Sequence, residues 1–438
     1  MSSGNVLRHP GFLRLLAGSA AALLGDQFTF IAIPWLVLKL TQESLALGMV
    51  VAFMGLPRLI FLLPAGALVD RYSPRTILVT ASLASAVVLG CFGMLVLADM
   101  VTLWMLYGFA VLMGLVGTFT LPARMAILPR VVAPEQLQSA NSIMMGATQI
   151  FVLAGPVLAG ILVSTSKGLG TAFLVDGICF LLAAVSVPRL VRAAESPDGE
   201  KDKHMFAAIF AGFRWVWGDR VLRLLVGYWI MAAFLAMGTM QVGLPLLVEK
   251  QLKLDSAAFG LLISVSGAGQ LMGILLSGLR ALKKIPLGVA VCMADIVAGL
   301  SLVGMGINQV LAVALVLVFT IGVGAGFVQV GLYTWIQHRI PNHLLGRVVS
   351  ILSLVMTAIA PVSALLAGTF THYITVSVLF MSMGGLLSCF ALLFLANRTI
   401  RGIRAVDVLA VTDGGDEPVV AKGDAIQPST SEAVTADG

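Results

Sequence analysis

Charged residues stand well inside long apolar stretches of this sequence, namely Asp26, Arg58, Asp176 and Asp295. A charge in an apolar environment is costly, so such residues pair with other groups or take part in the movement of protons and ions. A carboxyl group can bind and release a proton there, whereas an arginine keeps its charge. These residue types therefore point to proton exchange in a water-poor interior.

Asp26 and Arg58 are the leading candidates for this chemistry. Asp26 is near the middle of the apolar stretch at 12–38, and Arg58 is near the middle of the next one, at 44–69. In antiparallel neighbouring helices that rise about 1.5 Å per residue, the two side chains lie at a similar depth. We predict that they can pair. Either a proton on Asp26 loosens the pair and changes the favoured conformation, or the pair is a permanent structural one.

Other polar residues in the apolar stretches are candidates for lining a cavity. Asp176 and Asp295 have no obvious basic partner in their own stretches, and we expect hydrogen bonds to neighbouring helices to be their main role. Bulky organic ligands are held by an apolar wall with a few polar groups. The 20 Met and 22 Phe residues suit such a wall, and they suit packing equally well. The candidate cavity residues are Gln27, Gln149, Asp176, Gln241, Gln329 and Tyr333.

The elements that position these residues are predicted to be membrane helices. The 438 residues are 59% hydrophobic and 11% charged, whereas soluble domains carry about 25% charged residues. A water-soluble enzyme is therefore excluded. A spanning helix needs about 20 apolar residues, which predicts an all-α fold of twelve transmembrane helices in two six-helix bundles. The predicted spans are 12–38, 44–69, 76–98, 102–128, 139–164, 168–189, 220–248, 256–279, 286–306, 310–338, 346–370 and 374–396.

The basic residues predict the orientation of these helices. They gather at the N-terminus, at alternate helix ends and loops and at the C-terminus, with Arg124 among them. The other loops hold only Lys39, Lys167, Lys250 and Lys253. Basic loops stay in the cytoplasm, so we expect a multi-pass protein of the cell membrane with both termini in the cytoplasm. The net charge of +6 is explained in this way, and no nucleic-acid partner is expected.

The chain divides into four predicted regions. Residues 1–189 and 220–396 form the two six-helix bundles, and a cytoplasmic linker at 190–219 joins them. The linker includes "FAAIFAGFRWVWGDR", which either lies along the membrane surface or extends the seventh helix. Residues 397–438 are rich in small and acidic residues and are expected to be a disordered tail.

The two halves repeat one pattern. "LPRVVAPEQLQSANSIMMGATQIFVLAGPVLAGIL" matches "IQHRIPNHLLGRVVSILSLVMTAIAPVSALLAGTF", with Arg130 opposite Arg339 and Pro156 opposite Pro361. Parallel six-helix repeats place a binding cavity at their interface.

The segment "GALVDRYSPRTIL" resembles a loop signature of the major facilitator superfamily, although Ser73 and Pro74 depart from it. The resemblance implies a gate motif at Gly66, Asp70, Arg71 and Arg75 that holds the two halves together on the cytoplasmic side. A carboxylate at Asp70 is favoured near the N-terminus of the helix that begins around Gly346. For Arg71 and Arg75, a role as orientation signals alone stays open.

Longer segments, such as "LLGDQFTFIAIPWLV" and "LPARMAILPRVVAPEQLQSANS", resemble the branch of this family that contains enterobactin and macrolide exporters. The resemblance implies export of a small organic molecule by a monomer, driven by the proton gradient with no cofactor. Gly155, Pro156 and Gly160 match part of an antiporter signature. The proline kinks the helix, and this kink either shapes a gate or serves packing alone.

Three other classes of function require different residues. An uptake symporter for a polar nutrient requires more charged or amide groups in the helices. A lipid flippase on the same fold requires basic residues inside the cavity, and Arg58 keeps that class open. A membrane enzyme lacks support, because the chain has no metal-ligand cluster or nucleophile motif. The G-x-x-x-x-G-K-[ST] motif for ATP is also missing from the sequence.

Overall fold

The computed structural model describes residues 6–188, 214, 217–279, 285–340 and 342–403. Twelve helices in this part are long and apolar enough to cross a membrane, which confirms the prediction of twelve spans. The first six are α1 (Pro10–Thr41), α2 (Ser44–Arg71), α3 (Pro74–Leu97), α4 (Leu103–Val131), α5 (Leu137–Val163) and α6 (Gly168–Ser186). The second six are α8 (Arg220–Gly238, continued to Gln251), α10 (Ser256–Ser277), α11 (Leu287–Ile307), α12 (Leu311–Arg339), α13 (Asn342–Tyr373) and α14 (Val376–Ala396).

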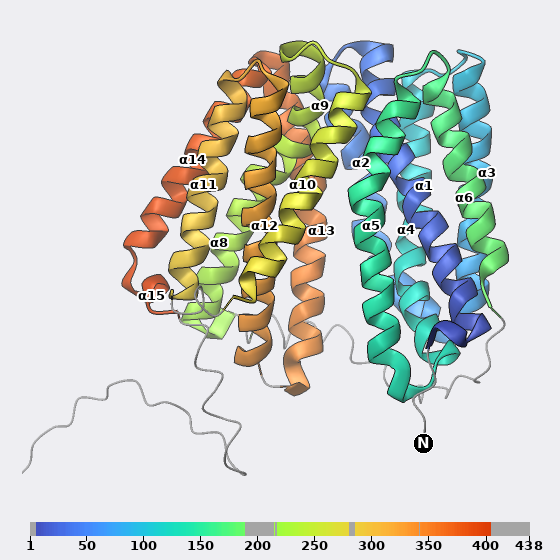
Figure 1. The fold of residues 1–438 in the computed structure, drawn as a ribbon, viewed down its shortest axis with the longest axis horizontal. Coiled ribbons are helices and arrows are strands. Elements are labelled where there is room, and N and C mark those ends of the chain that lie inside the picture. Colours follow the sequence, from blue (N-terminus) through green and yellow to red (C-terminus); the bar gives the residue numbers. More distant parts are fainter. Residues whose placement is uncertain (1–5, 189–213, 215–216, 280–284, 341, 404–438) are drawn as a thin grey trace, which may run out of the picture.

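The helices form two groups that lie side by side (Figure 1). Equivalent helices pack alike in the two halves. Helix α1 packs against α5 and α6, as α8 packs against α13 and α14. Helix α2 packs against α4, as α10 packs against α12, and α3 packs against α6, as α11 packs against α14. The sequence repeat is therefore also a repeat of helix packing.

The seventh span changes its winding in the second part of its length. Two π-helical segments, Thr239–Gly243 and Leu247–Gln251, flank the short α9 (Leu244–Leu246). The span is fixed at its end by Gln251, whose amide donates to the carbonyl oxygen of Gly306 at 3.1 Å. The hydroxyl of Ser377 donates to the same amide's oxygen at 2.9 Å. π-Helical segments occur often at functional sites, and here one of them contains Gln241.

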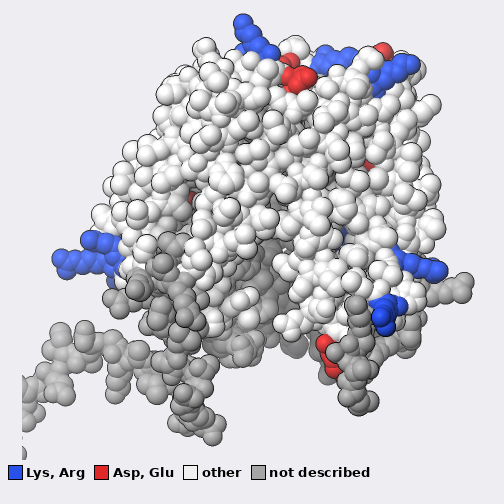
Figure 2. Space-filling model, in the orientation of Figure 1, with Lys and Arg blue, Asp and Glu red and all other residues white. Residues whose placement is uncertain are grey.

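Charged side chains gather at the two ends of the bundle and leave a mostly uncharged band between them (Figure 2). Helix α1 begins at one end, here called the basic face, which includes Arg8, Arg14, Arg130, Arg220, Arg339, Arg398 and Arg401. The other end, here called the opposite face, includes Lys39, Asp99 and Lys250. An uncharged band between polar ends is what a bilayer requires of a spanning protein.

The predicted linker and tail fall largely outside the described residues. In the linker, only Arg214 and residues 217–219 are described, so the predicted interfacial helix lies outside them. The tail is described as far as residue 403 and begins with the short α15 (Arg398–Arg401).

The two halves touch mainly through two helix pairs, α2 with α13 and α5 with α10, and α1 also contacts α10. In the first pair, Gly48 packs against Ala364 and Gly368, and Gly55 packs against Pro361. In the second pair, Gly160 packs against Ser256 and Gly260, and Gly260 also meets Pro156. The repeated prolines, Pro156 and Pro361, thus each face a glycine of the other half.

These contacts lie toward the opposite face. The hydroxyl of Ser44 donates to the carbonyl oxygen of Gly368 at 3.3 Å, and the hydroxyl of Ser256 donates to that of Gly160 at 3.0 Å. Toward the basic face, α2 and α5 instead expose large apolar side chains, such as Ile60 (58%) and Met145 (70%). The described contacts between the halves therefore gather toward the opposite face, and we infer that the molecule is open toward the basic face.

At the basic face, Asp219 joins the start of α8 to the end of α12. Its carboxylate accepts from the amides of Val221 (2.9 Å) and Leu222 (3.2 Å) and from Nε of Arg339 (2.9 Å). Burial acts to raise the pKa of Asp219, but these hydrogen bonds outweigh burial and hold the pKa below its ordinary value of 3.8. The ionised form therefore adds stability above that value, and the contribution is lost as the pH falls through the lowered pKa.

We expect Asp219→Ala to lower the free energy of unfolding by about 1 kcal/mol at pH 7, since a helix N-cap is lost. The loss should shrink as the pH falls below 3.8 and through the lowered pKa of Asp219, because the wild-type carboxylate then takes up a proton. Thermal unfolding in detergent at both pH values measures it. Lys39→Ala is the control, because its ion pair with Asp99 is exposed (56% and 77%) and should contribute little. Equal losses in the two variants would contradict the expectation.

Candidate functional site

The described intramembrane acids of the first half meet where α1 crosses α6. Gly25 makes this possible, because a β-carbon there would collide with Oδ1 of Asp176 and lie 2.8 Å from the β-carbon of Cys179. Small residues allow such close approach of helices. The crossing places Asp176 beside Asp26, the next residue of α1, and beside Thr29, one turn further along.

Asp26 is exposed, although α1 has other helices around it. Helix α1 packs against α2, α4, α5 and α6 and also contacts α10 of the other half, so we infer that the exposed surface of Asp26 faces the space between the two halves. Two cations act on it electrostatically, Arg124 most strongly and then Arg58. Neither arginine lies within ion-pair distance of Asp26 among the described residues. The predicted partner Arg58 is thus a neighbour of Asp26 without a direct ion pair in this conformation.

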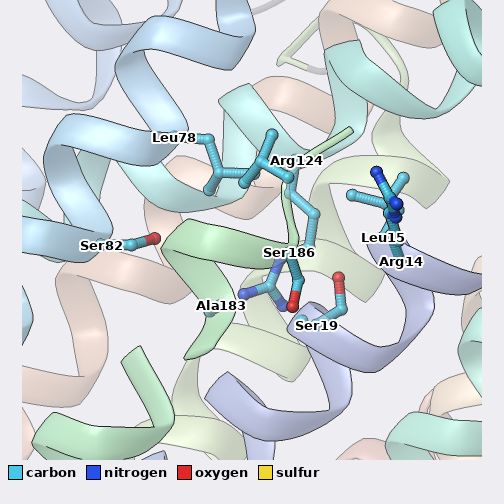
Figure 3. A pocket seen from close by; sticks show the side chains of 10 residues that line it. Arg14, Leu15, Ser19, Leu78, Ser82, Arg124, Ala183 and Ser186 are labelled. Carbon is cyan, nitrogen blue, oxygen red and sulfur yellow. The ribbon is translucent and has the colours of Figure 1, made fainter. Parts of the chain in front are cut away.

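Arg124 is the residue that the sequence pattern missed. Its position near Arg130 groups it with the cations at the helix ends, but α4 continues past Pro122 and Pro129 as far as Val131. The Arg124 side chain is half-buried and lines a small pocket between helices with Ser19 and Ser186. Figure 3 shows the guanidinium directed toward these two serines. The signal available in the sequence was the apolar run that continues beyond Arg124.

Asp176 is fully buried, with 0% of its surface exposed. Its Oδ2 accepts a hydrogen bond from the hydroxyl of Thr29. Its Oδ1 is buried and has no hydrogen-bond partner in the described part of the structure. Asp26 also acts on it electrostatically, as a second acid in the same region. The expected hydrogen bond to a neighbouring helix is present, but it satisfies only one of the two oxygens.

Arg58 is exposed and extends toward α4. Its guanidinium lies against Gly117, where Nη2 would be 3.1 Å from an added β-carbon. The glycine leaves room for the arginine, so a larger residue at position 117 would displace it. Arg58 and Arg124 thus approach Asp26 from two helices, α2 and α4.

The cavity candidates of the second half lie on α12 and in the π-helical part of the seventh span. Nε2 of Gln270 donates to Oε1 of Gln329 at 3.2 Å, which joins α10 to α12. Tyr333 packs edge-on against Trp229, with 6.1 Å between ring centroids. Gln241 is half-buried in the π-helical part of the seventh span. The sequence pattern did not single out Gln270 or Trp229, because neither differs in type from many packing residues.

Asp295 belongs to a separate cluster. The hydroxyl of Tyr228 donates to its Oδ2 at 2.6 Å, and Tyr228 is stacked on Phe390 at 5.4 Å. This hydrogen bond joins α8 to α11, in agreement with the structural role expected from the sequence.

The residues of the antiporter-like motif pack against two helices, α1 and α10. Gly155 is buried against the side chain of Gln27, so this cavity candidate holds α1 against α5. Pro156 and Gly160 meet α10 of the other half, as described above. Gln149, one and a half turns before Gly155, is half-buried on the same helix.

The gate motif is only partly described. Gly66 has open space around it, and Arg75 is half-buried with a buried Nε that has no hydrogen-bond partner among the described residues. The side chains of Asp70 and Arg71 lie outside the described part, and so does the latch predicted for them. Pro74 begins α3, a position that suits proline because the first helical amide has no partner.

The described residues contain no group of three or more His, Cys, Asp or Glu side chains that could hold a metal ion. What the site offers is two neighbouring acids, two arginines and a hydroxyl, set in an apolar surrounding. Such an arrangement can take up and release a proton, and the resulting change of charge can change the favoured conformation.

Comparison with known proteins gives a consistent result. The sequence model of the Major Facilitator Superfamily matches residues 15–364. The multidrug efflux pump Tap of Mycolicibacterium fortuitum is 29% identical over 373 residues, which cover 83% of this chain and 90% of that protein. The enterobactin exporter EntS of Escherichia coli O1:K1 / APEC is 23% identical over 348 residues, covering 78% and 80%.

Solved structures share the fold. A bacterial homologue of the iron transporter ferroportin, in an inward-facing state, aligns with a TM-score of 0.67 at 18% identity and covers 90% of this chain and 100% of its own. The nucleoside transporter NupG aligns with a TM-score of 0.68 at 12% identity, covering 88% and 98%.

Proposed function

The chain belongs to the Major Facilitator Superfamily and is a multi-pass membrane transporter, and on that premise we propose that it exports small hydrophobic or amphiphilic organic molecules in exchange for protons. The observation that carries the proposal is the Asp26 carboxylate, exposed among apolar helices and influenced by Arg124 and Arg58. A change of charge on Asp26 alters its attraction to both arginines, which lie on two other helices. Protonation is thereby coupled to helix arrangement.

The substrate class is supported by the lining of the helices and by the relatives. Helices that border the space between the halves expose large apolar side chains, including Leu56 (50%) in α2 and Ile150 (63%) in α5. Polar groups are few, as in sites that hold bulky organic molecules. Relatives that cover most of the chain are named multidrug efflux pump and enterobactin exporter.

The direction of transport rests on the orientation of the basic face. Basic ends of membrane helices stay in the cytoplasm, so we place the basic face, with both termini, on the cytoplasmic side of the cell membrane. The present conformation is then open to the cytoplasm, where an exporter takes up its substrate. The protein acts as a monomer, as the family resemblance implies. It needs no cofactor, because the proton gradient supplies the energy.

We expect cells that express the protein to accumulate less ethidium, macrolide antibiotic or catecholate siderophore than control cells. A proton uncoupler should abolish the difference, because export then loses its driving force. Fluorescence of ethidium and isotope-labelled macrolide and siderophore give the measurement. Accumulation unaffected by expression across this panel would count against the exporter proposal. Export that persists with the uncoupler would count against proton drive.

A lipid transporter on the same fold is the second candidate function. It is favoured by Arg58, whose exposed guanidinium lies among apolar helices and has no ion-pair partner among the described residues. A fluorescent phospholipid that crosses vesicle membranes only when the purified protein is present would support this function over drug export.

A further inference from the structure

Asp176 has an unusual surrounding for a carboxyl group inside a membrane. It is completely buried, and one of its oxygens has no hydrogen-bond partner in the described structure. An ionised carboxylate in such a place is very costly, and neutralisation by a proton removes most of that cost. The Thr29 hydroxyl satisfies only the other oxygen.

The groups around Asp176 favour a state in which Asp176 and Asp26 together carry one proton. Helix α6 packs against α1, α3 and α5. From α1, the second acid Asp26 acts on Asp176 electrostatically, and Cys179 lies one turn away from Asp176 on α6. Helix α5 has no titratable residue, and those of α3 are Arg75, near the basic face, and the exposed Cys91. Two neighbouring acids resist double ionisation.

The two acids differ in their access to water. Asp26 has an exposed surface, which we infer to face the space between the two halves, and the cations Arg124 and Arg58 act on it electrostatically. Asp176 has no exposed surface at all. Gly25 lets the helices approach so closely that Asp176 lies against it, and Gly25 directly precedes Asp26 in α1.

We propose that Asp176 holds an exchangeable proton on Oδ1 and that Asp26 passes this proton to and from the space open to the basic face. In release, the O–H bond of Asp176 breaks, a new O–H bond forms on Asp26, and water then takes the proton. No other bond changes. This inference rests on the proposed proton-coupled export and names where the proton is kept.

Infrared difference spectroscopy on the full chain in lipid nanodiscs tests the inference without a ligand, because a carboxyl group shows its carboxylic-acid C=O stretch only when it is protonated. We expect a protonated-acid band at neutral pH that disappears as the pH is raised. Asp176→Asn should remove the part of this band that comes from Asp176, here called the Asp176 component. The matched variant Asp295→Asn should retain the Asp176 component. In Asp26→Asn the component should remain but follow a pH step more slowly, by about tenfold or more.

A band that survives Asp176→Asn, or one that does not respond to pH, would overturn the inference. Should Asp176→Asn fail to fold, Thr29→Val keeps both acids and removes the hydroxyl that stabilises the ionised form. The band should then persist to higher pH, and an unchanged pH dependence would equally overturn the inference.

The two proposals can fail separately. If Asp176→Asn exports as the wild type does and remains sensitive to the uncoupler, proton coupling stands and the role of Asp176 is overturned. If the Asp176 band is present but wild-type export ignores the proton gradient, the exchangeable proton stands and proton-coupled export is overturned.

Discussion

Replacing Gly160 by Leu is expected to reduce export between about tenfold and a hundredfold. The new side chain would meet the carbonyl oxygen of Ser256, the Cα atom of Ala257 and the Cα atom of Gly260, all of which belong to the backbone of α10. Overpacking of this kind costs about 1–3 kcal/mol, and each 1.4 kcal/mol changes a population tenfold. The conformation closed at the opposite face would therefore become rare, and the transport cycle would stall.

The matched control is Gly146→Leu, on the same helix. Gly146 has no atom within 4 Å of an added β-carbon, so the same gain in side-chain volume should leave export near the wild-type value. Spin labels at positions 167 and 253, on different halves at the opposite face, measure the closure directly. We expect a longer distance between them in Gly160→Leu only. Wild-type export and an unchanged distance in this variant would show that the α5–α10 contact does not limit the cycle.

Replacing Asp26 by Asn is expected to reduce proton-driven export by about a hundredfold or more, since acid–base groups contribute at least about a hundredfold where they take part in a reaction. The amide has nearly the same shape as the acid but binds no exchangeable proton. Arg124 and Arg58 would then keep one surrounding throughout the cycle, and the proton gradient would no longer change it. Export from vesicles with an imposed pH gradient measures this loss.

Two controls make the result specific to the charge. Gln27→Glu adds an acid to the next residue of α1 and should not restore export to Asp26→Asn, because that side chain packs against Gly155 instead. Exchange of labelled substrate across the membrane without a gradient should persist in Asp26→Asn, since it requires binding and conformational change but no proton. Full pH-dependent export by Asp26→Asn would contradict the coupling role of Asp26.

The fold was largely predictable from the sequence, because apolar length alone defines a membrane helix. Twelve spans and the repeat of six followed from it and are confirmed. The candidate site was harder to predict from the sequence. Arg124 was placed with the helix ends because neighbouring prolines and Arg130 mimic a loop, whereas in the structure it lines a pocket within the bundle.

The partner of Asp26 could not be derived from depth alone. Equal depth on neighbouring helices predicted Arg58 as the partner of Asp26. The rotation of each helix about its axis, however, decides which side chains meet. That rotation depends on small residues such as Gly25 and Gly117, which determine how closely α6 and Arg58 approach their neighbours. A single sequence gives the positions of such glycines without saying which helix each of them faces.

The clustered acids and arginines belong to the first half, whereas the amide pair Gln270–Gln329 and the aromatic pair Trp229–Tyr333 belong to the second. On the proposed function, the two halves have separate roles. The first half couples export to the proton gradient, and the second half supplies much of the surface that binds the substrate. Substitutions in the second half can then change the exported substrate while proton coupling in the first half is kept. A chimera that joins residues 1–189 to the second half of a related exporter should keep its energy source and acquire the cargo of the donor.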